Sequence, residues 1–111
     1  MPDRAAARVL EALGDSNRRR IVELLRDEAR AVGAIAAEMD ISRPAVSRHL
    51  RLLEAAHLVS HREEGTRSIY FLSDAGAADA RAYLENMWGE SIARYRLLAD
   101  NLPPRAGDPR D

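Results

Sequence analysis

Apolar side chains recur along the chain with two different periods, and the change of period separates predicted helices from a predicted hairpin. Spacings of three and four residues are typical of helices with one buried face. They predict three short helices in the N-terminal part, with Gly14 placed to end the first and Asp15 or Ser16 placed to cap the second. The three apolar faces consist of Val9, Leu10 and Leu13, then Ile21, Val22, Leu24 and Leu25, then Val32, Ile35, Ala36 and Met39.

A fourth helix is predicted shortly after the third. Ser42 is a natural N-cap, Pro44 is tolerated in the first turn, and the helical spacing continues to about Ala56. Because only a few residues join the third and fourth helices, the pair has the pattern of a helix-turn-helix motif.

The C-terminal half of the chain predicts a hairpin and a long helix. Residues 58–62 and 67–72 change to a period of two around a turn that contains a glycine, which predicts a β-hairpin. A last helix is predicted from a cap at Ser73 or Asp74 as far as Asn101. Its apolar stripe consists of Leu84, Met87, Trp88, Ile92, Tyr95, Leu98 and Ala99. The element order predicts an α+β, mostly α fold, a winged helix-turn-helix with four helices, a two-stranded hairpin wing and a long C-terminal helix.

Composition indicates an ordinary globular chain and excludes several classes of function. The chain has 111 residues, of which 46% are hydrophobic and 32% charged. We expect one domain over residues 1–102 and a disordered tail over residues 103–111, which are rich in Pro, Gly and charge. No apolar run is long enough to span a membrane and no signal-peptide pattern is present, so we expect a cytoplasmic protein. Without Cys, a Gly-rich phosphate loop or a metal triad, neither an enzyme nor a cofactor is expected.

The fourth helix carries the strongest functional pattern. Steps of about 100° per residue place its apolar residues on one arc, with His49 and Leu52 among them. The opposite arc consists of Arg43, Pro44, Ser47, Arg48 and Arg51. Arginine pairs bidentately with guanine in the major groove, and serine donates or accepts hydrogen bonds there, although the same face also fits a solvated charged surface. Because the net charge of the chain is −1, DNA binding has to come from such a local arrangement.

The basic residues are expected to divide into two roles. Ser47, Arg48 and Arg43 are expected to read base edges, while Arg51, farther along the helix, contacts phosphate. In the hairpin, Arg67 is expected to contact phosphate at most, because two acidic residues lie at the same tip.

The stretch ISRPAVSRHLRLLE, residues 41–54, resembles the recognition helix of the ArsR/SmtB family of bacterial winged-helix repressors. Segments at residues 13–21, 56–59 and 65–72 are similar to that family in the same order, so the resemblance covers roughly residues 5–100. It implies a homodimer on a double-stranded DNA operator of imperfect two-fold symmetry, acting as a repressor and often on its own promoter. The expected DNA-contacting set is Ser42, Arg43, Pro44, Ser47, Arg48, Arg51 and Arg67.

The chain departs from that family in its candidate metal ligands. Many members sense metals through thiolates in the third helix or through His and carboxylate pairs in the last helix. Here there is no Cys, and no His follows His61. Carboxylates without imidazole hold a transition metal poorly, so the resemblance points to a metal-independent branch, and no metal site is expected. No motif identifies an effector.

The stripe of the last helix lies outside the helix-turn-helix, where large apolar groups need a partner. We expect it to form the dimer interface together with the first helix. The expected interface residues are Val9, Leu13, Leu84, Met87, Trp88, Ile92 and Tyr95. Two alternatives stay open. A cavity at this interface would bind a small organic effector that releases the repressor, or the winged helix would place its arginine face against an acidic protein instead of DNA.

Overall fold

The computed structural model describes residues 3–101, and the chain divides into two compact units, Met1–Arg81 and Ala82–Asp111. Each unit is described by itself. The predicted domain boundary after residue 102 and the predicted disordered tail over residues 103–111 lie outside the described residues.

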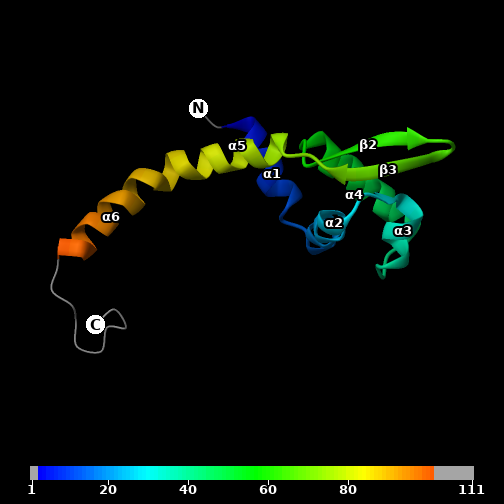
Figure 1. Ribbon diagram of the computed structural model, residues 1–111, viewed down its shortest axis with the longest axis horizontal. Helices are drawn as coiled ribbons and strands as arrows, with labels where there is room; N and C mark the ends of the chain where they lie inside the picture. Colours follow the sequence, from blue (N-terminus) through cyan, green and yellow to red (C-terminus); the bar gives the residue numbers. More distant parts are fainter. Residues whose placement is uncertain (1–2, 102–111) are drawn as a thin grey trace. The chain divides into compact units, whose positions relative to one another are not determined.

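The first unit has the element order that the sequence predicts, with one addition (Figure 1). Its elements are α1 (Arg4–Ala12), α2 (Ser16–Asp27), β1 (Arg30–Ala31), α3 (Val32–Ala37), α4 (Arg43–Ala55), β2 (Val59–Glu64), β3 (Arg67–Leu72) and α5 (Ala75–Leu84), which continues into the second unit. Four helices followed by a hairpin and a further helix confirm the mostly helical α+β winged fold.

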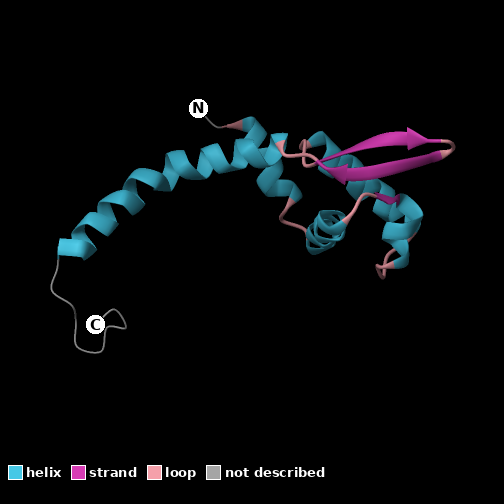
Figure 2. Cartoon of the chain, viewed as in Figure 1, coloured by secondary structure: helices cyan, strands magenta, loops and turns pink. Residues whose placement is uncertain are grey.

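The predicted two-stranded hairpin is confirmed as β2 and β3, and a short additional strand, β1, extends it to a three-stranded sheet (Figure 2). The strand order is β1-β3-β2, and both pairings are antiparallel. β1 is only two residues long, with Arg30 opposite Tyr70 and Ala31 opposite Ile69. A strand of this length has no period to detect, so the sequence did not indicate β1. Because Ala31 of β1 pairs with Ile69 and α3 begins at Val32, the start of α3 lies beside β3.

Asp residues cap the first two helices. The Asp3 carboxylate accepts a hydrogen bond from the Ala6 N–H at 3.1 Å. Asp15 accepts from the N–H groups of Asn17 at 2.8 Å and Arg18 at 3.1 Å, which confirms one of the two predicted caps for α2. These hydrogen bonds lower the pKa of Asp15 below its usual range, because they favour the charged carboxylate. The bond from the Arg18 N–H has the larger effect and the bond from the Asn17 N–H the smaller one.

The core lies where α1, α2, α3 and α4 meet the base of the hairpin. The predicted helical faces supply most of it, which confirms their periodicity. Its fully buried large side chains are Val9, Ile21, Ile35, Val46, Leu50, Leu53 and Val59. α4 is therefore anchored by three residues of its own inner face, Val46, Leu50 and Leu53.

The end of α4 is closed by a left-handed residue. His57 has a φ of 59°, and two bonds close the turn: its N–H donates to the Glu54 carbonyl, and the Leu58 N–H donates to the Leu53 carbonyl, both at 3.0 Å. Gly76, near the start of α5, then donates its N–H to the His57 carbonyl at 2.8 Å. A Cβ at Gly76 would collide with the Ala56 carbonyl oxygen and lie 2.9 Å from that of His57. The start of α5 therefore packs backbone to backbone against the end of α4.

Replacing Gly76 with Ala should lower the free energy of unfolding by about 1–3 kcal/mol, because the added methyl group meets fixed carbonyl oxygens rather than movable side chains. The matched control is Gly89→Ala, since nothing lies within 4 Å of the Cβ position at Gly89. The control should leave stability unchanged or raise it by up to about 1 kcal/mol. Urea unfolding followed by circular dichroism, at one protein concentration, measures both. Equal stability of the two variants would contradict the close approach.

The second unit continues the helix of α5 through a π-helical turn, η1 (Glu85–Gly89), into α6 (Glu90–Asn101). The predicted long helix to Asn101 is confirmed, and the π turn is an addition to it. A wider turn suits the stripe, because Leu84, Trp88 and Ile92 follow one another at intervals of four residues. Across residues 3–101, no helix has the length and apolar character needed to cross a membrane.

Candidate nucleic-acid interface

The start of α4 is defined by its cap. The Ser42 hydroxyl accepts a hydrogen bond from the Ala45 N–H at 3.2 Å, and the Ser42 carbonyl accepts from the Val46 N–H at 3.0 Å. Pro44 lies in the first turn, where its missing N–H costs nothing. The predicted N-cap is confirmed. Because the cap closes the first turn, the side chains that follow it have defined directions.

α4 has a narrow buried face and a wide exposed one. Val46, Leu50 and Leu53 have no exposed surface. The predicted basic arc lies on the outside: Ser42, Arg43, Pro44, Arg48 and Arg51 are exposed, and Ser47 is half-buried. One residue was placed wrongly by the helical arc, because Leu52 is 49% exposed instead of buried. The apolar arc of α4 is narrower than an ideal helical projection suggests.

Four exposed arginines of α4 and the wing form no hydrogen bond or ion pair in the described part of the chain. The arginines concerned are Arg43, Arg48 and Arg51 of α4, together with Arg67 at the start of β3. Among residues 3–101, none of the four forms a hydrogen bond or an ion pair with another side chain or carbonyl group. The five N–H donors of each guanidinium group are therefore available to a ligand.

The acidic residues at the tip of the wing are occupied by neighbours in the wing itself. Arg62 Nε donates to Glu64 at 2.9 Å, and the Ser68 hydroxyl donates to Glu63 at 2.9 Å. Glu64 lies opposite Arg67 in the strand register, yet its ion pair is with Arg62. Glu64, whose charge is compensated by Arg62, therefore offsets the charge of Arg67 less than its nearness in sequence implies.

The hairpin is tied to α4 by a histidine. His61 of β2 lies with its Nδ1 2.8 Å from the Glu54 carboxylate, and its ring stacks on Tyr70 with centroids 5.1 Å apart. The pKa of Tyr70 is raised above its usual range, mainly because burial disfavours the charged phenolate and secondly because the Glu54 carboxylate lies nearby. This cluster fixes the base of the hairpin relative to α4.

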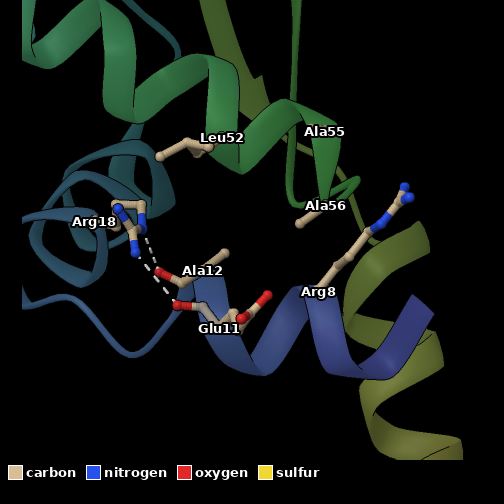
Figure 3. A pocket seen from close by; sticks show the side chains of 7 residues that line it. All are labelled: Arg8, Glu11, Ala12, Arg18, Leu52, Ala55 and Ala56. Atoms are coloured by element: carbon tan, nitrogen blue, oxygen red, sulfur yellow. Dashed lines mark hydrogen bonds between the residues drawn. The ribbon is translucent and has the colours of Figure 1, made fainter. Parts of the chain in front are cut away.

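Arg18 of α2 contacts both α1 and α4, and Figure 3 shows its two bonds to the end of α1. Its guanidinium donates to the carbonyl of Ala12 at 2.7 Å and to that of Glu11 at 3.3 Å, at the C-terminal end of α1. It also donates to His49 Nδ1 at 3.3 Å. His49 is half-buried and bonded within the chain, in agreement with its predicted structural role. Neither residue is available to read bases.

A cavity of about 420 Å³ lies between α1 and the second half of α4. Its walls include Arg8, Glu11, Arg18 and the exposed Leu52, all drawn in Figure 3. The sequence pattern did not indicate this cavity, because it depends on how far apart two helices pack. It leaves Leu52 of α4 open to solvent in the single chain.

The predicted dimer-interface residues fall into two groups. In the second unit and at its border, Leu84, Met87, Trp88, Ile92 and Tyr95 are all exposed, Trp88 by 52% and Tyr95 by 72%. In α1 the expectation needs correction, because Val9 is only 1% exposed and packs in the core of its own chain. Leu13 is partly buried against the same core, while Leu10, on the other side of α1, is 45% exposed. Val9 therefore has no surface left for a partner.

The described residues, 3–101, hold no group of three or more His, Asp or Glu side chains arranged to bind a metal ion. His57, exposed at the end of α4, and His61, bonded to Glu54, serve the local structure described above.

Comparison with known proteins agrees with this geometry. A helix-turn-helix domain family matches residues 5–62, which run from α1 into β2. The chain is 43% identical over 100 residues to the HTH-type transcriptional regulator Rv2034 of Mycobacterium tuberculosis, covering 90% of each chain. It is 32% identical over 78 residues to the transcriptional repressor SdpR of Bacillus subtilis, covering 70% of this chain and 87% of that one.

Solved structures with the same fold also belong to transcriptional regulators. The crystal structure of a possible transcriptional regulator for arsenical resistance matches with a TM-score of 0.66 and 37% identity, covering 85% of this chain and 96% of that one. The homodimeric winged helix-turn-helix DNA-binding domain of a possible ArsR-family regulator from Mycobacterium bovis matches with a TM-score of 0.61 and 32% identity, covering 89% and 87%. This chain is therefore a member of the ArsR/SmtB family of winged helix-turn-helix transcriptional regulators.

Proposed function

We propose that the protein is a cytoplasmic repressor that binds a double-stranded DNA operator as a homodimer and regulates its own promoter. The observation that carries this proposal is the outer face of α4. It presents unpaired arginines and a serine on a helix that is capped at Ser42 and anchored by Val46, Leu50 and Leu53. A rigid helix with this chemistry on its outer face suits the major groove.

Within this proposal, the residues of α4 have different tasks according to their place along the helix. Ser47 and Arg48, in the N-terminal half, contact base edges, where arginine distinguishes guanine by a bidentate pair. Arg51, one turn farther along, and Arg67 on the wing contact phosphates and so position the protein on the duplex. Ser42 and Pro44 hold the start of the helix close to the DNA backbone.

A homodimer follows from the size of one recognition helix, which covers only a few base pairs. Two copies related by a two-fold axis place their recognition helices in successive major grooves about 34–36 Å apart, on an operator of matching symmetry. The exposed stripe around Trp88 is the surface proposed to join them. The homodimeric state of the Mycobacterium bovis relative supports this arrangement.

Binding of the purified protein to the promoter upstream of its own gene tests the proposal. The affinity should fall steeply with salt, since log K changes by about 0.9 per phosphate neutralised for each unit of log salt concentration. Six phosphate contacts across a dimer correspond to a loss of about 10³-fold between 50 and 200 mM salt. Fluorescence anisotropy at several salt concentrations measures this slope. Failure to bind any duplex, with capture of an acidic protein instead, would favour a winged helix used for protein contact.

A further inference from the structure

A second cavity, of about 430 Å³, opens where three separate segments of the first unit meet. It is lined by residues 31–34 at the start of α3, Arg43 in the first turn of α4, and residues 66–68 at the start of β3. The pairing of Ala31 with Ile69 brings the first and third of these segments together. In Figure 1, α3 and the hairpin lie at the same end of this unit.

The charges of this cavity are of one sign. Arg43 and Arg67 are its two charged residues, no acidic side chain lines it, and neither arginine has an ion pair within the described residues. The guanidinium of Arg43 lies over Gly33, with Cζ 3.8 Å and Nη1 3.7 Å from the position that a Cβ would occupy there. Thr66 adds a hydroxyl group beside Arg67. Two arginines that line one cavity and form no ion pair within the described residues fit an oxyanion, which arginine binds through paired N–H donors.

We propose that this cavity binds one phosphate group of the DNA backbone, held jointly by Arg43 and Arg67. The proposal rests on the proposed function and adds a specific contact to it. Arg43 belongs both to the cavity and to the outer face of α4, so an anion bound here lies at the edge of the surface assigned to the major groove. A backbone phosphate therefore fits this position better than a free anion does.

The assignment changes the role expected for Arg43 from reading bases to positioning the backbone. It also gives the wing a function that its acidic tip obscures. One phosphate held between the recognition helix and the wing fixes how far along the duplex Ser47 and Arg48 lie. Arg43 and Arg67 act in this way as a two-part clamp built from different elements.

The first test compares Arg43→Gln and Arg67→Gln with the exposed Arg26→Gln of α2 as a matched change of charge. Each cavity variant should weaken binding to the operator and to random duplex by the same factor, about tenfold or more. Each should also reduce the salt slope by about one per protomer. Arg26→Gln should change neither. Because all three side chains are exposed, circular dichroism should show unchanged folding.

The second test neutralises single phosphates of the operator with methylphosphonate linkages. At one position in each half-site, the neutral linkage should weaken binding of the wild-type protein strongly and binding of Arg43→Gln or Arg67→Gln by a clearly smaller factor, because each variant keeps only one of the two arginines. Sensitivity of the two variants to different phosphates would overturn the shared site, as would a loss by Arg43→Gln on the operator alone. Tight binding of inorganic phosphate alone, lost in both variants, would overturn the backbone assignment in favour of a small free oxyanion.

Failure of the proposed function is distinguished by the wild-type protein. If the wild type binds no duplex with a measurable salt slope, the proposed function and this inference both fail. If it binds with a steep slope that Arg43→Gln and Arg67→Gln leave unchanged, only this inference fails.

Discussion

Replacing Trp88 with Glu should shift the protein from dimer to monomer and lower its operator affinity by about 100-fold or more. Trp88 is 52% exposed in the chain, and Leu84, Met87, Ile92 and Tyr95 of the same stripe are exposed as well. Burial of such groups between subunits is favourable by about 25 cal/mol per Å². A charge in the middle of that surface opposes association. Once the subunits separate, each recognition helix binds alone and loses the gain of about 10²- to 10⁴-fold that linked binding supplies.

The control for this variant, Ala93→Glu, introduces the same charge on the other side of the helix. Ala93 is exposed, and steps of about 100° per residue place it on the side of the helix away from Trp88 and Ile92. Ala93→Glu should remain dimeric and bind the operator normally. Sedimentation and anisotropy measure both properties, and circular dichroism checks that the helix persists. A wild-type protein that sediments as a monomer while bound to its operator would exclude the proposed interface.

Replacing Arg48 with Ala should cost about 1–3 kcal/mol on the operator and much less on random duplex. Arg48 is exposed on α4, has no ion pair among the described residues, and lies in the N-terminal half of the helix. A base contact is made only on the matching sequence, so its loss lowers specificity. The operator for this measurement is the fragment recovered by pull-down from sheared genomic DNA and sequencing.

The matched variant is Arg51→Ala, three residues farther along the same helix. Loss of a phosphate contact should weaken binding to the operator and to random DNA by similar factors and reduce the salt slope. The difference between the two variants is the result that matters. If Arg48→Ala loses equally on both DNAs, Arg48 contacts the backbone, and base reading has to be assigned to other residues.

The sequence by itself determined the elements and the side of α4 that carries the chemistry. The 3.6-residue spacing of apolar residues placed Val46, Leu50 and Leu53 on the buried face of α4, although it also placed the exposed Leu52 there. Its start is equally local, because a serine cap acts within three residues. The same helical period predicts that the arginines of α4 lie on its exposed face, and this prediction needs no information from any other part of the chain.

The tertiary structure decided what depends on two or more elements meeting. The short strand β1 exists because the edge of β3 offers Arg30 and Ala31 unpaired backbone groups, a partner that lies far away in sequence. Val9 and Leu10 look alike in a pattern of apolar residues, yet only the packing of α1 places one in the core and the other on the surface. Arg43 and Arg67 are separated by a helix and a strand and share one cavity only because the sheet brings β3 beside the start of α3. Local periodicity identifies the face of each element, whereas convergence of side chains from separate elements requires the long-range packing that only the folded chain supplies.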